Sequence, residues 1–270
     1  MAKKSTIQVE KVNQHIVNWL KEYALKANVN GFVIGISGGV DSAVTSTLCA
    51  QTGLTTLCIE LPIYQDPTQV TRGKEHIEQL KERFPNVKND VADLTAVFEM
   101  FRNEVPDSED EAKLNLSLAN TRARLRMTTL YYFAGINGLL VAGTGNKVED
   151  FGVGFYTKYG DGGVDLSPIA DLMKSDVYAL GEYLEIPESI KRAAPTDGLF
   201  GDSRTDEDQL GASYDELEWA MHEVEKNKKS EDFSGREKEV FDVYKKLNTT
   251  NQHKMHPIPV CLIPSNIKFC

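Results

Sequence analysis

The fold is decided by the segment Phe32-Val33-Ile34-Gly35-Ile36-Ser37-Gly38-Gly39-Val40-Asp41-Ser42. Its first five residues are apolar or glycine and include β-branched side chains, which is typical of a buried strand. Ser37-Gly38-Gly39 then turns the chain, and a helix is predicted over 41–51. Backbone N–H groups at such a strand-to-helix turn can hold an anion, and adjacent glycines let phosphate oxygens approach the backbone. We therefore interpret the turn as a phosphate-binding loop.

The predicted ATP-binding residues of this loop are Gly35, Ile36, Ser37, Gly38, Gly39, Val40, Asp41 and Ser42. It is not a Walker A loop, because no Gly-Lys-Ser/Thr follows, and its glycine spacing does not fit G-x-G-x-x-G. Asp41 can hold Mg²⁺ on the phosphates. The alternative is a Ser/Gly turn that caps a helix, with Asp41 interacting only with the helix dipole.

Strands alternate with helices on both sides of this loop, which predicts an α/β fold: a parallel sheet with helices on both faces. Further strands are predicted at 54–61, 87–91 and 139–142, and helices at 9–27, 67–84, 94–103, 114–136, 173–184, 214–225 and 234–247. We expect one domain over 1–270, with a core at about 8–196. The polar stretch 198–210 is predicted to be a mobile loop that is disordered without ligand. Residues 213–270 are predicted to form a helical C-terminal lid and tail.

Composition restricts the class of protein. The chain has 270 residues, 41% of them hydrophobic, and a formal net charge of −10. Proteins that grip a nucleic-acid backbone are usually basic, so we expect no nucleic-acid partner. We also expect no membrane partner and no signal peptide, because no apolar run has the required length. Four cysteines lie far apart with no C-x-x-C pair, which suits a reducing cytoplasm.

The loop resembles the Ser-Gly-Gly-x-Asp-Ser motif of the N-type ATP pyrophosphatases, which cleave ATP between its α- and β-phosphates. Later segments, at 143–150 and 154–166, at Lys174 and at Pro195-Thr196, resemble NAD synthetases in order and spacing. The resemblance runs from about 31 to 199 and resumes at His253-Lys254. It implies a fold like that of the adenine nucleotide alpha hydrolases. It also implies ATP-dependent amidation of deamido-NAD to NAD by ammonia, through an adenylated nicotinate, with release of AMP and pyrophosphate.

The resemblance also implies roles for individual residues. Besides the loop, the ATP-binding residues would be Thr144, Lys174 and Thr196, and the Mg²⁺ ligands would be Asp41 and Glu149. The deamido-NAD-binding residues would be Arg124, Lys158, Asp165, His253 and Lys254. From the chemistry of the reaction, and not from the resemblance, we hypothesise that Asp161 or Asp165 takes the proton of incoming ammonium. Members of the family commonly form homodimers with substrate sites at the interface, and we expect a homodimer here.

Two features depart from this pattern. Bacterial relatives often carry Arg before Leu-Pro where this chain has Glu60, and an acid cannot supply a cationic contact to ATP. The segment 143–149 resembles the glutamine-using branch, yet no nitrilase-like cysteine context is present, so free ammonia is the expected nitrogen donor.

Two other functions stay open. One is another amide- or thio-forming ligase of the same superfamily, and the other is a non-catalytic adenine-nucleotide-binding module. Taken singly, Lys158 and Lys174 are more simply explained as surface lysines.

Overall fold

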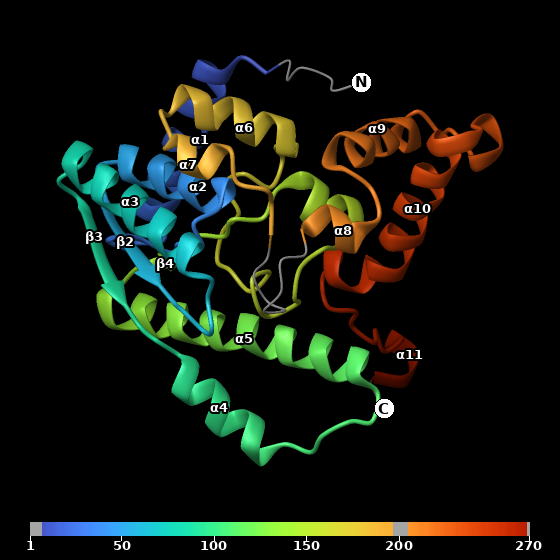
Figure 1. Cartoon of the computed structure of the whole chain (residues 1–270), viewed down its shortest axis with the longest axis horizontal. Coiled ribbons are helices and arrows are strands. Elements are labelled where there is room, and N and C mark those ends of the chain that lie inside the picture. The colour runs from blue at the N-terminus through green and yellow to red at the C-terminus, as the bar shows by residue number, and fades with distance from the viewer. Residues whose placement is uncertain (1–6, 197–204, 269–270) are drawn as a thin grey trace.

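A sheet of four parallel strands organises the computed structural model, which describes residues 7–196 and 205–268 (Figure 1). The strands are β1 (Gly31–Gly35), β2 (Thr55–Glu60), β3 (Val87–Val91) and β4 (Leu140–Val141). Their order is β3-β2-β1-β4, so the chain changes direction of winding at β1. In open α/β sheets, ligands bind beyond the carboxyl ends of the strands at such a switch point. The loop that follows β1 lies at this point.

Helices cover both faces of the sheet. The helices on one face are α1 (Val9–Lys26), α2 (Val40–Gln51), α3 (Pro67–Arg83) and α6 (Lys174–Tyr183), and those on the other are α4 (Thr95–Glu104) and α5 (Glu111–Asn137). Alternate side chains of β1 divide between these layers: Phe32 and Ile34 pack with the first set, whereas Val33 packs with the second. Burial on both faces explains why the strand is apolar throughout. The predicted α/β fold class is confirmed.

Local signals set the ends of the helices that carry the site. The side chain of Asp66 accepts a hydrogen bond from the Thr68 N–H at 2.7 Å, and Pro67 occupies the first turn of α3. The long helix α5 ends at Gly138, whose φ of 63° lies in the left-handed region that glycine adopts without strain. The Asp66 cap thus lies at the carboxyl edge of the sheet, after β2, whereas Gly138 lies at the amino edge, where its carbonyl accepts a hydrogen bond from the Asn30 N–H at 2.9 Å.

A second group of helices packs beside the sheet (Figure 1). It consists of a π-helical turn η1 (Val148–Val153), α8 (Asp206–Leu210), α9 (Tyr214–Glu225) and α10 (Gly235–Met255). Apolar side chains from η1, α9 and α10 form a separate cluster that includes Val148, Leu217 and Val240. The remaining short elements are α7 (Glu188–Lys191), the 3-10 turn η2 (Ser230–Asp232) and α11 (Ser265–Lys268). This group supports the turn that carries Glu149.

Several predicted elements differ from those observed. The strand predicted at 139–142 shortens to Leu140–Val141, followed by a single bridge between Ala142 and Leu166. The helix predicted at 234–247 continues to Met255 and so includes His253 and Lys254. Of the loop predicted at 198–210, residues 206–210 form α8, and 197–204 lie outside the described residues. Its mobility stays a prediction.

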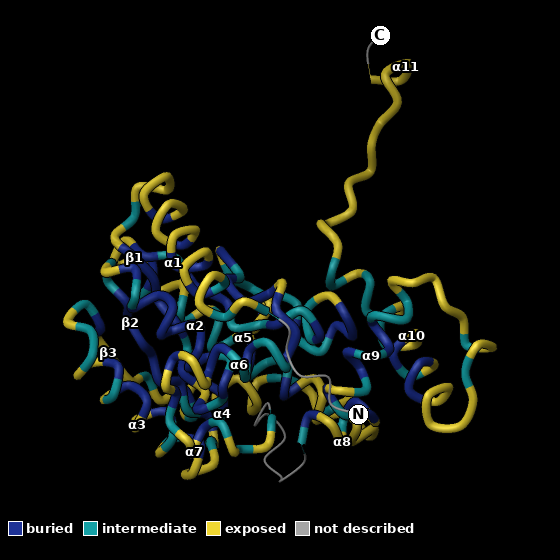
Figure 2. Tube along the Cα trace, turned by 90° about the horizontal axis from the view of Figure 1, so that it is seen from above, coloured by how far each residue is buried: buried dark blue, intermediate teal, exposed yellow. Residues whose placement is uncertain are grey.

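The chain leaves the body of the protein after α10. Every residue from 256 to 268 is exposed, and Figure 2 shows this segment extending away from the other elements. It carries large apolar side chains at Ile258, Val260 and Leu262. Within the described ranges, none of the helices is both long and apolar enough to cross a membrane.

Candidate active site

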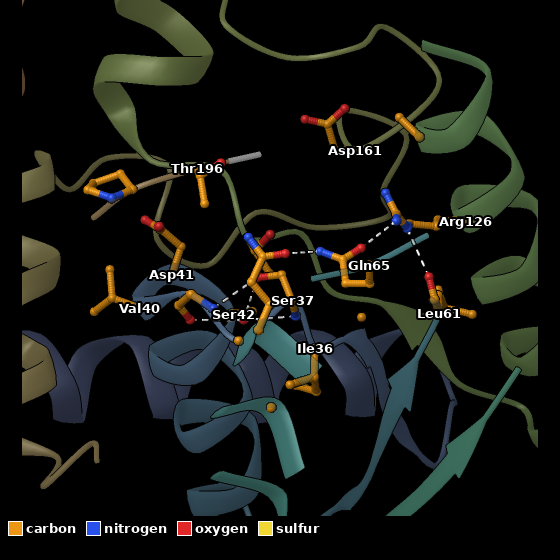
Figure 3. A pocket seen from close by; sticks show the side chains of 18 of the residues that line it. Ile36, Ser37, Val40, Asp41, Ser42, Leu61, Gln65, Arg126, Asp161 and Thr196 are labelled. Atoms are coloured by element: carbon orange, nitrogen blue, oxygen red, sulfur yellow. Dashed lines mark hydrogen bonds between the residues drawn. The ribbon is translucent and has the colours of Figure 1, made fainter. Parts of the chain in front are cut away.

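A cavity of about 290 Å³ lies at the carboxyl edge of the sheet (Figure 3). Its walls come from the loop after β1, the end of β2, one side of α5 and the segment after β4. All eight predicted loop residues line it, as do Thr144, Asp161, Lys174 and Thr196. The fold therefore brings residues that are far apart in the sequence, from Gly35 to Thr196, to the wall of one cavity.

The loop is held in shape by its own serines. The hydroxyl oxygens of Ser37 and Ser42 lie 3.1 Å apart, and Ser42 donates to the Gly39 carbonyl at 3.0 Å. Gly38 has a φ of 81°, and a Cβ built there would lie 2.4 Å from the backbone oxygen of Gln69 on α3. A side chain at this position would therefore be both strained and in collision with α3. The first N–H groups of α2 follow directly and provide an anion-binding end.

A buried lysine lies beside the loop. The Nζ atom of Lys174 is 2.7 Å from Asp41 Oδ2 and 3.0 Å from Glu149 Oε1, and the residue is only 3% exposed. Burial disfavours the charged form, but the two carboxylates outweigh it and raise the pKa of Lys174. The ammonium group therefore stays charged and draws Asp41 and Glu149 together, although they lie on different elements, the first turn of α2 and η1.

Two further side chains orient these carboxylates. Asn146 donates to Asp41 Oδ1 at 3.0 Å, while its own oxygen accepts from the Val148 and Glu149 N–H groups. The Tyr214 hydroxyl donates to Glu149 Oε1 at 2.6 Å. Burial and the adjacent Glu149 charge raise the pKa of Tyr214, so the hydroxyl keeps its proton. The phenol thus fixes Glu149 from the α9 side.

Asp41 and Glu149 suit a magnesium ion as far as donor chemistry goes. Both supply hard carboxylate oxygens, and both approach one point within 3.0 Å, the Lys174 ammonium. In residues 7–196 and 205–268 no group of three or more His, Cys, Asp or Glu side chains is arranged to hold a metal. Two protein ligands fit Mg²⁺, which usually takes its other ligands from phosphates and water.

Asp161 projects into the same cavity from the Gly-rich segment (Figure 3). Its Oδ1 accepts a hydrogen bond from the Thr157 N–H at 2.8 Å. The side chain is accessible from the cavity, yet protein surrounds that space, and this desolvation raises the pKa of Asp161 to about 6. Desolvation, followed by the charges of Glu149, Asp161 and Asp41, raises the pKa of Asp150 to about 8. Negative charge is therefore costly at this end of the cavity.

The residues predicted to bind deamido-NAD gather at a different place. Arg124 Nε and Nη2 lie 3.4 Å from the Lys158 carbonyl oxygen, and the Lys158 ammonium donates to the His253 carbonyl. Lys254 donates to the carbonyls of Gly154 and Tyr156, each at 2.8 Å. These three cations and one histidine thus join α5, the Gly-rich segment and the end of α10. None of them is among the residues that line the cavity.

Asp165, which was assigned both to that set and to proton transfer, has structural partners. Its two oxygens accept hydrogen bonds from the Tyr131 hydroxyl at 3.0 Å and from the Val141 N–H at 2.8 Å. It lies outside the cavity wall. Asp161 is therefore the better placed of the two candidate proton acceptors.

Sequence reasoning missed several residues of the site. Arg126 donates to the Leu61 carbonyl at 3.0 Å and to Gln65 at 2.8 Å, and Arg72 donates to the Gly38 carbonyl at 3.2 Å. Both arginines line the cavity. Arg126 stands two positions after Arg124 on a helix, so the two side chains point to different sides, and a helical projection would have separated them. Tyr214 gives no such signal, because its partner lies 65 residues away.

The fold and the site together define a class: α/β proteins that place a glycine-rich phosphate loop at the carboxyl edge of a parallel sheet. Comparison with known proteins narrows this class, because the model of the NAD synthase family matches residues 12–258. The chain belongs to the NAD synthase family.

Individual relatives agree with this membership. The chain is 36% identical over 246 residues to the NH3-dependent NAD+ synthetase of Carboxydothermus hydrogenoformans, covering 91% of this chain and 94% of that protein. It is 37% identical over 227 residues to the protein of the same name from Methanococcus aeolicus, covering 83% and 87%.

Solved structures agree as well. The NMN synthetase of Francisella tularensis matches with a TM-score of 0.80 and 30% identity, covering 96% of this chain and 99% of that one. The NH3-dependent NAD synthetase of Campylobacter jejuni has a TM-score of 0.76 and 23% identity, over 95% and 100%, and supports the fold alone.

Proposed function

We propose that the protein converts deamido-NAD to NAD with ATP and ammonia, through an adenylated nicotinate, and releases AMP and pyrophosphate. One observation carries the proposal: Asp41 and Glu149 converge on the buried Lys174 beside a Ser-Gly-Gly loop, in a member of the NAD synthase family. A phosphate loop alone would suit many nucleotide-binding proteins. Two carboxylates and a buried cation around it suit chemistry at the phosphates.

ATP binding is assigned to the cavity. The loop from Gly35 to Ser42 and the start of α2 would hold the phosphates, with Thr144 and Thr196 adding hydroxyl groups from the cavity wall. Lys174 supplies a fixed positive charge near the same point. Asp41 and Glu149 would hold Mg²⁺, which when bound neutralises phosphate charge. With Mg²⁺ bound, Asp41 and Glu149 would have two cationic neighbours, the ion and the Lys174 ammonium.

The reaction then proceeds in two steps. A carboxylate oxygen of the nicotinate attacks the α-phosphorus of ATP, the bond to the bridging oxygen of the β-phosphate breaks, and pyrophosphate leaves. Ammonia attacks the acyl carbon of the mixed anhydride, and AMP leaves with the electron pair of the broken C–O bond. Asp161 is placed to hold the proton that incoming ammonium gives up, because it borders the cavity and its pKa is raised to about 6. The remaining protein groups contribute position and charge.

Deamido-NAD would be bound by the cluster of Arg124, Lys158, His253 and Lys254. The positive side chains of Arg124, Lys158 and Lys254 gather there, and this suits an anionic dinucleotide. The cluster lies outside the wall of the ATP cavity within one chain. We also propose a homodimer, in which a second copy would complete the binding site between this cluster and the ATP cavity.

Apolar surface supports the homodimer. Met100 on α4 is 71% exposed, and Tyr132 and Ile136 on α5 are 64% and 62% exposed. Exposed large apolar side chains that gather on neighbouring helices often mark a protein interface. Light scattering after gel filtration should give twice the mass of 30.1 kDa. A single species at the monomer mass in micromolar solution would contradict this proposal.

We further propose one structural domain over the whole chain and a cytoplasmic place of action. The free thiols of Cys49, Cys58 and Cys261 suit a reducing compartment. The α9–α10 group packs on η1, which itself carries Glu149, and this supports treating it as part of the same domain.

A product assay tests the function. Purified protein is incubated with ATP, Mg²⁺, deamido-NAD and ammonium, each omitted in turn, and AMP, pyrophosphate and NAD are measured. The three products should appear in equal amounts, and only when all components are present. ADP as the nucleotide product would contradict the proposal. Nucleotide binding without turnover would favour a non-catalytic module, and turnover only with another acyl substrate would favour a different ligase of the superfamily.

A second substrate is favoured by one comparison. The Francisella tularensis structure, described as an NMN synthetase, matches with higher identity and TM-score than the Campylobacter jejuni NAD synthetase. The same two steps would then act on nicotinic acid mononucleotide. Competition between the mononucleotide and deamido-NAD, read as the ratio of their kcat/KM values, decides between the two substrates.

A further inference from the structure

Glu60 is the last residue of β2 and lies at the wall of the ATP cavity. It is only 7% exposed. Its neighbour Ile59 pairs with Gly35, the residue at which the phosphate loop begins. The Glu60 side chain is therefore one strand away from the predicted phosphate site, at the carboxyl edge of the sheet.

The carboxylate of Glu60 lacks a partner. Across residues 7–196 and 205–268, no hydrogen-bond donor reaches its oxygens, and Lys74 acts on it only through space. The two arginines of the cavity wall have other partners, since Arg126 donates to the Leu61 carbonyl and to Gln65, and Arg72 donates to the Gly38 carbonyl. Burial raises the pKa of Glu60, with Lys74 opposing the effect. The Glu60 oxygens thus border the cavity without a protein donor, so a ligand that supplies a donor would be stabilised there.

The surroundings of Glu60 differ from those of the phosphate end. Figure 3 places Asp41 and Thr196 on one side of the cavity, and Leu61, Gln65 and Arg126 on the other. The apolar residues that line the same cavity include Ile36, Leu61, Val70, Met127 and Leu130. A flat aromatic base with a polar edge suits apolar walls that carry one acceptor. Phosphate does not, because a carboxylate repels it.

We propose that Glu60 recognises the base of ATP by accepting a hydrogen bond from the exocyclic amino group of adenine. This inference rests on the proposed function, because it places ATP in the cavity with its phosphates on the Gly35–Ser42 loop. Bacterial relatives often carry Arg at this position, which can make a cationic contact to ATP. The Glu60 carboxylate can instead accept a hydrogen bond from a donor group of the nucleoside. Both the ionised and the protonated carboxyl group retain an acceptor oxygen, so the contact persists across neutral pH.

A cycle of changes in nucleotide and protein tests the contact. The nucleotides are ATP and purine riboside 5′-triphosphate, which lacks the amino group, and the proteins are wild type, Glu60→Met and Glu60→Gln. In wild type, loss of the amino group should lower kcat/KM for the nucleotide about tenfold to a hundredfold, the range of hydrogen bonds to charged groups. In Glu60→Met the two nucleotides should react equally. Glu60→Gln, which keeps an acceptor oxygen, should recover part of the preference.

Controls separate this contact from folding and from the ribose. Glu82→Met, on the exposed side of α3, should behave as wild type toward both nucleotides. If Glu60→Met removes the penalty for 2′-deoxy- or 3′-deoxy-ATP instead of that for the missing amino group, the ribose is the partner and the inference is wrong.

The wild-type comparison needs no variant, so it can overturn the inference even if Glu60→Met does not fold, and Glu60→Gln then assigns the contact to this side chain. Equal kcat/KM for ATP and the purine nucleotide in wild type overturns the inference alone. Absence of AMP formation from ATP in wild type overturns the proposed function instead.

Discussion

Replacing Lys174 with methionine should destabilise the protein strongly, because it removes the only cation that bridges Asp41 and Glu149 in the described part of the chain. Both contacts are short, 2.7 and 3.0 Å, and the lysine is 3% exposed. Removing one partner of a buried ion pair costs about 3–5 kcal/mol, because the remaining charge is left uncompensated. For a domain near this size, that corresponds to a fall in Tm of about 6–20 °C.

Urea unfolding followed by the fluorescence of Trp19 and Trp219 measures this loss. The control is Lys226→Met, which removes an exposed lysine 2.6 Å from Glu223 and should change the unfolding free energy little.

Magnesium gives a second readout of the same change. Because Asp41 and Glu149 keep their oxygens in Lys174→Met, Mg²⁺ should raise the Tm of the variant by more than that of wild type. A loss below about 1 kcal/mol at pH 7 would refute the description of Lys174 as the buried counter-ion of the site. A loss that Mg²⁺ does not reduce would refute it equally.

Three further changes test the surroundings of the loop. Gly38→Ala should lose more stability and more ATP turnover than Gly53→Ala, because both have positive φ but only Gly38 would place its Cβ 2.4 Å from a backbone oxygen; equal losses in urea titrations would show that the close approach is unimportant. Tyr214→Phe removes the 2.6 Å hydrogen bond to Glu149 and should cost about 1–3 kcal/mol in unfolding free energy, and an unchanged midpoint would contradict that contact. The Asp161 carboxyl has a folded pKa raised to about 6, so wild type should lose stability relative to Asp161→Asn as pH rises from 4 to 6, and parallel stability curves over that range would disprove the shift.

The central part of the fold follows from the sequence because its signals are local. Apolar β-branched runs identify β1 and β2, and the Ser-Gly-Gly turn marks the step from strand to helix. Alternation of strands and helices then requires crossovers, and these give the parallel sheet. The fold class, confirmed by the structure, needed no long-range information.

Elements shaped by tertiary packing were harder to predict. The π-helical turn Val148–Val153 has no periodic pattern of its own and is held by α9 and α10. The end of α10 continues to Met255 in a polar stretch, where hydrophobic periodicity gives little guidance. Packing against η1 stabilises that last turn, and the sequence pattern does not contain this contact.

The residues of the site likewise fall into two groups, those identified by local sequence and those that depend on tertiary contacts. The loop residues are adjacent in sequence, so they could be identified together, whereas the contact of Lys174 with Asp41 spans 133 residues. Lys174 was assigned through resemblance to the family, and its burial between two acids could not be predicted from a helix start that contains a lysine. The separation of the Arg124–Lys158–His253–Lys254 cluster from the cavity is likewise a property of the folded chain alone.

The attack of a carboxylate on the α-phosphorus is tested most directly by following its oxygen. Deamido-NAD labelled with ¹⁸O in both oxygens of the nicotinate carboxylate is converted with unlabelled ATP and ammonium, and the products are analysed by mass spectrometry. The proposed reaction transfers one labelled oxygen to the phosphate of AMP and leaves the other in the amide of NAD. Unlabelled AMP, or label in pyrophosphate, would contradict an acyl-adenylate intermediate.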